Sequence, residues 1–291
     1  MTLRHYAIFI AVCKKQSMTA AAKDLHMTQP SISQAIRELE DHFNVLLFER
    51  LRRRLYITPA GQRLLNFAKQ IIELNQRAER TMNGDNYLYP IRLGASLTIG
   101  ETLLVNTLQQ IKNTLPAQPI ISEIHNTEVL QNKLLDGSLD IALVEGDITS
   151  PYLKKIPFTD DELVPAFSSS LWNPNNPSIT LEELCQFPLF LREKGSGTRN
   201  LFEQTIRKEQ INYHVIGIYN NSESIKNAVM AGLGATVISR RLIENEIKDG
   251  RILSPKLENV RLSRIFTIVY HQHKFISPAL QTIIQIAHTL K

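Results

Sequence analysis

Cysteine is scarce in this chain, since only Cys13 and Cys185 occur among 291 residues. Two distant cysteines without a CxxC pair exclude a small disulfide-stapled secreted domain and favour a reducing compartment. No apolar run approaches the roughly 18 residues that a membrane-spanning helix needs. With only 12 glycines and 13 prolines, collagen-like and low-complexity architectures are excluded as well. The apolar content of 43% is enough for buried cores, and the length suits two or three domains.

The apolar stretch at residues 6–13 follows Arg4 and has some features of a signal peptide. Lys14 and Lys15 interrupt it before any cleavage site, which argues against secretion. The sequence therefore predicts a cytoplasmic protein without membrane contacts.

The positive charge is concentrated at the N-terminal end. Residues 1–80 hold 13 of the 33 Lys/Arg and 7 of the 28 Asp/Glu, a balance of +6, so the remaining residues carry −1 of the net +5. This asymmetry favours an N-terminal module that binds a polyanion, although a solvated basic face would look the same.

Three short helical patterns follow one another over residues 3–42. Ser17 or Thr19 can cap the second helix with a hydroxyl, and Thr28 can cap the third, where Pro30 fits the first turn. The spacing is typical of a helix-turn-helix, with small or apolar residues facing inward. These inward residues are Ala21, Ala22, Leu25, Met27, Ile32 and Ala35.

The outward face of the third helix carries polar side chains of a length that reaches base edges in the major groove. They are Gln29, Ser31, Ser33, Gln34 and Arg37. Any amphipathic helix also has a polar face, so this pattern alone leaves both interpretations open. The next segment, residues 46–57, predicts two short strands around a basic tip, which is a wing. Its arginines would contact phosphates without reading sequence: Arg50, Arg52, Arg53 and Arg54.

Residues 3–67 resemble the winged helix-turn-helix of LysR-type transcriptional regulators. The resemblance lies in Phe9, Ser17, Ala21-Ala22, Leu25, Gln29-Pro30-Ser31, Ser33, Leu39-Glu40, Leu47-Phe48, Arg50, Thr58 and Ala60-Gly61. It implies double-stranded promoter DNA as a partner, contacted by the polar and basic residues above together with Thr19, Thr28 and Pro30. Gln16 and Asn44 stand where the family commonly has glycine, and Met18 replaces a usual aromatic residue.

A helix of about 22 residues is predicted from Ala60 to the region of Met82, because no helix breaker interrupts its apolar stripe. A helix of this length cannot bury all of its apolar side chains against a small domain. Pairing with a second copy accounts for it and is similar to the dimerisation helix of the family, whereas packing on the C-terminal part is the alternative. The predicted boundaries are 1–59 for the DNA-binding domain, 60–82 for the helix and 83–90 for a hinge.

From Ile91 onward, strand and helix patterns alternate, which predicts an α/β fold with a mostly parallel sheet. A single helix is expected over residues 98–115, and strands at 91–95, 141–144, 162–167 and 264–270. The two α/β halves resemble the periplasmic-binding-protein-like effector domain of the family. By that resemblance, subdomain I comprises 91–162 and 264–291, and subdomain II comprises 163–263.

Ligands of such folds bind between the halves, at the carboxyl ends of strands and the N-termini of helices. Hydroxyl, glycine and charged residues in those places form the predicted effector site, although each Ser or Thr could instead be a simple helix cap. They are Ser96, Thr98, Thr127, Glu145, Gly195, Ser196, Thr198, Arg199, Glu223 and Ser224. The stretches around residues 143–146, 192–199 and 223–234 look most like the CysL-like and CbbR-like subgroups. That likeness implies a small anionic effector.

Little supports other chemistry. His271 and His273 share one face of a strand without a third ligand nearby, so no metal site is expected. Ser196 lacks the GxSxG elbow and its surroundings lack the GxxxxGK[ST] loop, so neither a catalytic triad nor a bound nucleotide cofactor is expected.

The sequence leaves three function classes open. The first is a homodimeric or homotetrameric regulator that senses an effector, for which RNA polymerase is a further candidate partner. The second is an enzyme tethered to DNA, which the lack of a catalytic pair argues against. The third is an architectural DNA-binding protein whose cleft is filled by side chains.

Overall fold

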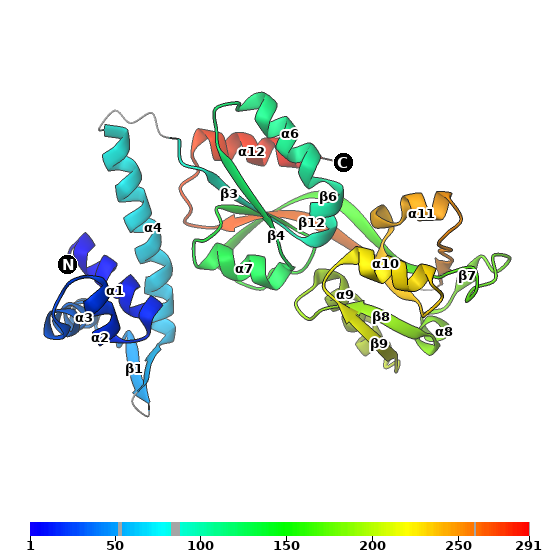
Figure 1. The fold of residues 1–291 in the computed structure, drawn as a ribbon, viewed down its shortest axis with the longest axis horizontal. Helices are drawn as coiled ribbons and strands as arrows, with labels where there is room; N and C mark the ends of the chain where they lie inside the picture. Colours follow the sequence, from blue (N-terminus) through cyan, green and yellow to red (C-terminus); the bar gives the residue numbers. More distant parts are fainter. Residues whose placement is uncertain (52–53, 83–87, 259, 291) are drawn as a thin grey trace. The chain divides into compact units, whose positions relative to one another are not determined.

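The computed structural model describes residues 1–51, 54–82, 88–258 and 260–290. The chain forms two compact units that meet in the sequence between Tyr89 and Pro90. Figure 1 shows the elements of both units. Each unit is described separately.

The N-terminal unit consists of three helices, a two-stranded wing and a long helix. The helices are α1 (Leu3–Lys15), α2 (Met18–Asp24), α3 (Gln29–Phe43) and α4 (Pro59–Met82), and the antiparallel strands are β1 (Phe48–Leu51) and β2 (Arg54–Ile57). These elements confirm the winged helix-turn-helix expected from the sequence.

Hydroxyl side chains begin the helices as the sequence predicts. Ser17 Oγ accepts the amide of Ala20 at 3.2 Å and begins α2, so Ser17 rather than Thr19 is the cap. Thr28 is the N-cap of α3, and Pro30 follows within its first turn. Each cap satisfies an amide that would otherwise lack a partner.

The core of this unit joins the three helices to α4 and the wing. Phe9, Ile32 and Leu39 are fully buried, as is Ala68 of α4. Burial of such side chains contributes about 1.5–3 kcal/mol each. Helix α3 is therefore held by its apolar side while its polar side stays exposed.

Gln16 and Asn44, the two residues that replace family glycines, both adopt left-handed backbone conformations. Their φ angles are 49° and 51°. The conformation is less costly for asparagine than for glutamine.

We expect Gln16→Gly to raise the free energy of unfolding of this unit by about 1 kcal/mol, because glycine adopts positive φ without steric cost. Hydrogen exchange of the slowest amides of α1 to α3 in the full chain measures the change. Lys14→Gly, inside α1, is the matched control and is expected to lower stability by about 1 kcal/mol. If both substitutions destabilise equally, the backbone at Gln16 carries no strain.

The C-terminal unit has two α/β lobes. Lobe I contains β3 (Ile91–Ala95), α5 (Leu97–Thr102), α6 (Leu104–Thr114), β4 (Ile120–Ile124), α7 (Thr127–Leu135), β5 (Ile141–Val144) and α12 (Pro278–His288). Lobe II contains β7 (Ser178–Ile179), α8 (Leu181–Gln186), β8 (Pro188–Arg192), α9 (Gly197–Glu209), β9 (His214–Tyr219), α10 (Ser222–Met230), β10 (Thr236–Ser239), α11 (Glu244–Lys248) and β11 (Lys256–Leu257). Two long strands, β6 (Leu153–Ala166) and β12 (Leu262–His271), run through both lobes.

The main sheet has the strand order β10-β6-β12-β5-β3-β4. Only β3, β4 and β5 pair in parallel, whereas β6 and β12 pair antiparallel with each other and with their neighbours. The expectation of a mostly parallel sheet is therefore confirmed for the strands between Ile91 and Val144, and the lobe II pairs β8–β9 and β7–β11 are parallel as well, whereas the six-stranded sheet is mixed. The sheet is mixed because the two long strands return in opposite directions between the lobes.

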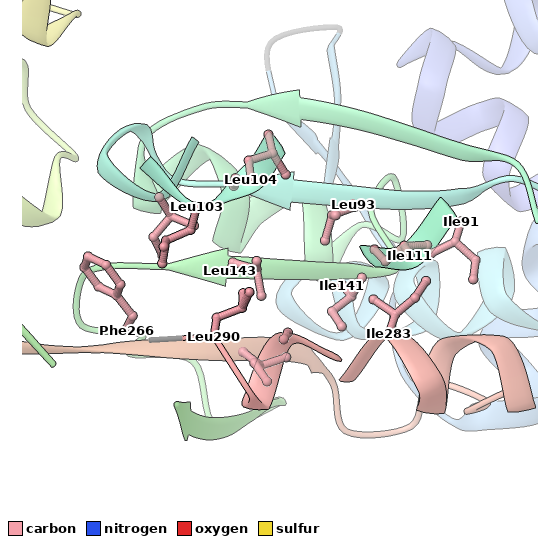
Figure 2. Close-up of a cluster of buried hydrophobic side chains, with 14 of the residues drawn as sticks. Ile91, Leu93, Leu103, Leu104, Ile111, Ile141, Leu143, Phe266, Ile283 and Leu290 are labelled. Carbon is pink, nitrogen blue, oxygen red and sulfur yellow. The ribbon is translucent and has the colours of Figure 1, made fainter. Parts of the chain in front are cut away.

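Apolar side chains fill both faces of the lobe I sheet. On one face, α6 and α12 cover a core that includes Leu93, Ile141 and Leu143, which Figure 2 shows on adjacent strands. On the other face, Leu130 of α7 lies against Gly94, where a Cβ would come within 2.6 Å of a Leu130 methyl carbon. The strands are thus fixed from both sides, and their carboxyl ends are held in register.

Two expected elements differ from the structure. The helix expected over 98–115 is divided at Leu103 into α5 and α6, and the strand expected from residue 162 begins at Leu153. Lobe II has two separate apolar clusters, one around Leu184 and Phe202 and one around Ile225 and Val229.

Candidate functional site

The exposed side of α3 presents the polar residues that the sequence assigned to DNA. Gln29, Pro30, Ser31, Gln34 and Arg37 are exposed, and Ser33 is half-buried. Thr19 of α2 and the cap residue Thr28 are exposed beside them. A helix with a rigid apolar side and this polar side matches the shape of a major-groove reader.

The wing is described only in part. Arg50 and Arg54 lie on β1 and β2, where Arg50 pairs with Leu55 and Arg54 pairs with Leu51. Arg52 and Arg53 lie outside the described residues.

Between the two lobes, a buried arginine joins hydroxyls from both sides. Arg264 of β12 donates to Thr98 Oγ1 of lobe I at 3.0 Å and to Thr198 Oγ1 of lobe II at 2.9 Å. All three side chains are at least nine-tenths buried. The structure therefore brings Thr98 and Thr198 together, and it does so through a residue that the sequence reasoning missed.

Two buried carboxylates neutralise this arginine. Asp161 of β6 faces Arg264 across the strand pair and accepts its Nε at 2.7 Å, and Glu145 lies 3.7 Å from its Nη1. Ser239 donates to Asp161 at 2.6 Å, and Arg241 approaches the same carboxylate at 3.8 Å. Two guanidinium groups face two carboxylates, so the cluster as a whole carries no net charge.

Glu145 also occupies the helix start that the sequence assigned to an anion. Its carboxylate accepts the backbone amide of Thr98 at 2.9 Å. The N-terminus of α5 thus already has a negatively charged partner from the protein itself. The amide of Thr98 is therefore already occupied by a side chain of the protein.

Besides Thr98 and Thr198, three buried hydroxyls near the boundary between the lobes lack a hydrogen-bond partner in the part of the chain that the structure describes. Ser96 Oγ, Thr127 Oγ1 and Ser196 Oγ are buried and make no hydrogen bond within the described ranges. Ser96 follows β3, Thr127 begins α7, and Ser196 is the N-cap of α9, although its side chain does not cap the helix. A buried hydroxyl without a partner costs about 1–3 kcal/mol, so a polar group that hydrogen-bonds to these three would be stabilised there.

Glycines allow the two lobes to touch beside these hydroxyls. A Cβ on Gly146 would lie 2.8 Å from the Gly197 Cα and 3.1 Å from Thr127 Oγ1. Thr127 therefore faces the first turn of α9 across the cleft, and Ser196 is the residue before Gly197. Any side chain at either glycine would force the lobes apart.

Polar contacts hold the lobes together along the rim. Asn126 donates to Glu193 Oε1 at 3.2 Å, the amide of Glu128 donates to the Gly195 carbonyl at 3.3 Å, and Ser222 donates to Glu101. Burial opposes the negative charge of Glu193, but its pairing with Arg192 outweighs that effect and lowers the pKa of Glu193. The carboxylate therefore stays ionised as the acceptor for Asn126.

Family models match almost the whole chain. Residues 3–62 match the bacterial regulatory helix-turn-helix protein of the lysR family, and residues 89–290 match the LysR substrate binding domain. The chain belongs to the LysR family of transcriptional regulators. Members of this family are DNA-binding regulators with an effector-binding domain, and not enzymes.

Relatives of this LysR-type regulator agree with the subgroup expected from the sequence. A protein of Thalassiosira pseudonana named "Probable RuBisCO transcriptional regulator" is 30% identical over 92% of this chain and 91% of that protein. The HTH-type transcriptional regulator CysL of Bacillus subtilis (strain 168) is 28% identical over 90% and 88%. The crystal structure of ArgP from Mycobacterium tuberculosis has the same fold, with a TM-score of 0.77, 19% identity and coverage of 98% and 95%.

Two predicted effector residues of this LysR-type regulator, Arg199 and Glu223, have partners on their own helices. Arg199 donates to Glu203 at 2.6 Å and to the Arg192 carbonyl at 3.1 Å, so its positive charge is paired within lobe II. Glu223 pairs with Lys226 at 2.5 Å, and Ser224 is exposed. The positive φ of Gly195, 85°, shapes the turn against Asn126 and Glu128.

The sequence reasoning also missed residues that this LysR-type regulator places at the cleft. Ser222, two residues before the predicted Ser224, is buried and contacts lobe I. A signal for Arg264 was present, because strand alternation puts it on the same side as Leu262 and Phe266, which are buried. An arginine at an inward position of a strand needs a buried partner.

No group of three or more His, Cys, Asp or Glu is placed to hold a metal ion within residues 1–51, 54–82, 88–258 and 260–290. Within the same ranges, no helix is both long and apolar enough to cross a membrane.

Proposed function

We propose that this regulator binds promoter DNA as a homodimer or homotetramer and senses a small anionic metabolite in the cleft between its lobes. The observation that carries the proposal is the set of buried hydroxyls of Ser96, Thr127 and Ser196, which lack partners among the described residues. They lie at the carboxyl ends of strands, where α/β folds bind ligands.

The chemistry of the cleft favours an anion held by neutral donors. Arg264 is compensated by Glu145 and Asp161, so it offers no free charge to a ligand. Hydroxyls and the first amides of α9 are hydrogen-bond donors that stabilise an oxyanion without a dedicated lysine. Polar side chains meet between Thr98 and Thr198, which argues against a cleft filled by apolar side chains.

The DNA-binding part of the proposal assigns residues 1–59 to promoter contact. The exposed polar side of α3 would read bases, with Thr19 and Thr28 beside it. The wing arginines Arg50, Arg52, Arg53 and Arg54 would contact phosphates. Such contacts make binding strongly salt-dependent.

The assembly part assigns α4, over residues 60–82, to contact with a second copy. Ile71 is 37% exposed and Leu74 is 49% exposed on this helix, which is unusual for large apolar side chains along one helix. Most of the expected hinge, residues 83–90, lies outside the described residues. Effector binding would change the spacing of the two recognition helices and the access of RNA polymerase.

The test of the effector site uses calorimetric titration of the full chain with three small anions: sulfate, inorganic phosphate and acetate. We expect at least one of these probes to bind, and Thr127→Val and Ser196→Ala to weaken it about tenfold or more. The reason is that each charge-assisted hydrogen bond contributes roughly 1.5–3 kcal/mol. DNA binding without the probe is expected to persist.

The matched control is Ser224→Ala, which removes an exposed hydroxyl from lobe II and is expected to leave the affinity unchanged. If the wild-type chain binds none of the three probes, the anionic class is wrong. If the probe binds all four proteins equally, its site lies outside the cleft.

A further inference from the structure

Gln34 lies in the middle of the exposed face of α3, and its amide has two chemically different ends. The Nε2 end donates hydrogen bonds and the Oε1 end accepts them. Which end faces the major groove decides which bases it can read. Guanine presents two acceptors there, whereas adenine and cytosine present an exocyclic amino donor.

Glu38, one helical turn later, holds the donor end of Gln34. Gln34 Nε2 donates to Glu38 Oε1 at 3.0 Å. Hydrogen bonds from His5 and then from Gln34 lower the pKa of Glu38, so it is a carboxylate at neutral pH. A carboxylate only accepts hydrogen bonds, and the reversed amide would therefore place two oxygens against each other.

His5 of α1 fixes Glu38 in turn. Its Nδ1 accepts the backbone amide of Thr2 at 3.2 Å, so in the neutral ring the proton is on Nε2. That Nε2 lies 2.7 Å from Glu38 Oε2 and donates to it. Glu38 is therefore the acceptor in both of these hydrogen bonds, from His5 and from Gln34.

We propose that Glu38 is a positioning residue that turns Oε1 of Gln34 toward the DNA. Gln34 then reads a base with an exocyclic amino group, adenine or cytosine, and rejects guanine and thymine at that position. The inference rests on the proposed role of Gln34 in base readout, and it adds the kind of base and the residue that sets it.

The experiment selects bound sequences from a random double-stranded DNA library with the full-length wild type, Gln34→Ala and Glu38→Ala. The wild type is expected to favour adenine or cytosine about tenfold or more at one position of each half-site. Gln34→Ala is expected to lose this preference. Glu38→Ala is expected to admit guanine or thymine at the same position, because the free amide can turn over.

Two controls separate this effect from charge and folding. Asp41→Ala removes an exposed carboxylate from the same helix without touching Gln34, and it is expected to keep the wild-type preference. Glu38→Gln keeps the side-chain length but only one acceptor oxygen, which His5 Nε2 takes. Its amide nitrogen then faces Gln34, so this variant is expected to favour guanine or thymine at the same position and not merely to lose the preference. Unfolding midpoints of all variants are compared, because a merely structural role would move stability and leave base preference unchanged.

The outcomes distinguish base readout by Gln34 from the positioning role of Glu38. If Gln34→Ala leaves every position unchanged, Gln34 does not read bases and that part of the proposed function fails. If Gln34→Ala removes a preference that Glu38→Ala leaves intact, the positioning role of Glu38 is overturned. A wild-type preference for guanine or thymine at the Gln34 position also overturns it.

Discussion

Arg264→Met is expected to lower the free energy of unfolding of the C-terminal unit by about 3–5 kcal/mol. The substitution removes one partner of a buried charge cluster and leaves Asp161 and Glu145 buried without their guanidinium. It also removes the donor that joins Thr98 to Thr198. Fluorescence of Trp172, the single tryptophan, which is packed against Phe167 and Phe187 in lobe II, reports the transition in denaturant.

The matched control for this prediction is Arg261→Met, three residues earlier. Its side chain is 78% exposed and pairs with Glu162 at 3.3 Å, so its loss is expected to cost no more than about 1 kcal/mol. Similar losses for the two substitutions would show that the buried cluster contributes no more than a surface ion pair. A double variant, Arg264→Met with Asp161→Leu, is expected to recover part of the loss, because the buried carboxylate directly opposite position 264 is then gone.

Ile71→Asp is expected to convert the assembled protein to monomers and to weaken binding of a two-half-site operator by about 100- to 10,000-fold. A carboxylate buried in a helix seam is costly, and a monomer loses the second half-site contact. Sedimentation velocity measures the assembly state, and fluorescence anisotropy with one or two half-sites measures the affinity. Affinity for a single half-site is expected to stay close to that of the wild type.

Gln76→Asp on the same helix is the control, because it adds the same charge at an exposed polar position. It is expected to remain assembled and to bind the operator normally. An Ile71→Asp protein that sediments like the wild type would place the contact between copies away from α4.

The sequence predicts the N-terminal unit well because local chemistry specifies its elements. Hydroxyl caps at Ser17 and Thr28, a proline in the first helical turn and a basic wing tip each specify one feature. Strands β3 and β5 are likewise predicted at their observed bounds, because both are short buried apolar runs.

Features set by tertiary packing were not predictable in this way. No breaker marks Leu103, where the helix divides. The first half of β6 reads Lys-Lys-Ile-Pro-Phe-Thr-Asp-Asp after Leu153, a largely exposed and polar stretch without a strand pattern. Its strand conformation comes from pairing with β12, which is about a hundred residues away in the sequence.

The residues of the candidate site also fall into two groups, those predictable from the sequence and those set by tertiary contacts. Ser96, Thr127 and Ser196 were predictable because strand ends of an α/β fold converge whatever their separation in sequence. Arg199 and Glu223 instead pair with Glu203 and Lys226 on their own helices, and the sequence alone did not show which partner each would choose. Arg264 was missed because its importance lies in contacts with Thr98, Asp161 and Thr198, none of which is near it in the sequence.

The position of β12 in the middle of the main sheet has a consequence for synthesis of the protein. Because β12 lies between β5 and β6, the sheet has no continuous hydrogen-bonded path between the lobes until residues 262–271 have left the ribosome. At about 5–20 residues per second, the N-terminal unit is complete roughly 10–40 s earlier. A nascent or truncated chain that ends before β12 therefore carries a folded DNA-binding unit and an unfinished effector unit, and it would occupy promoters without responding to any effector.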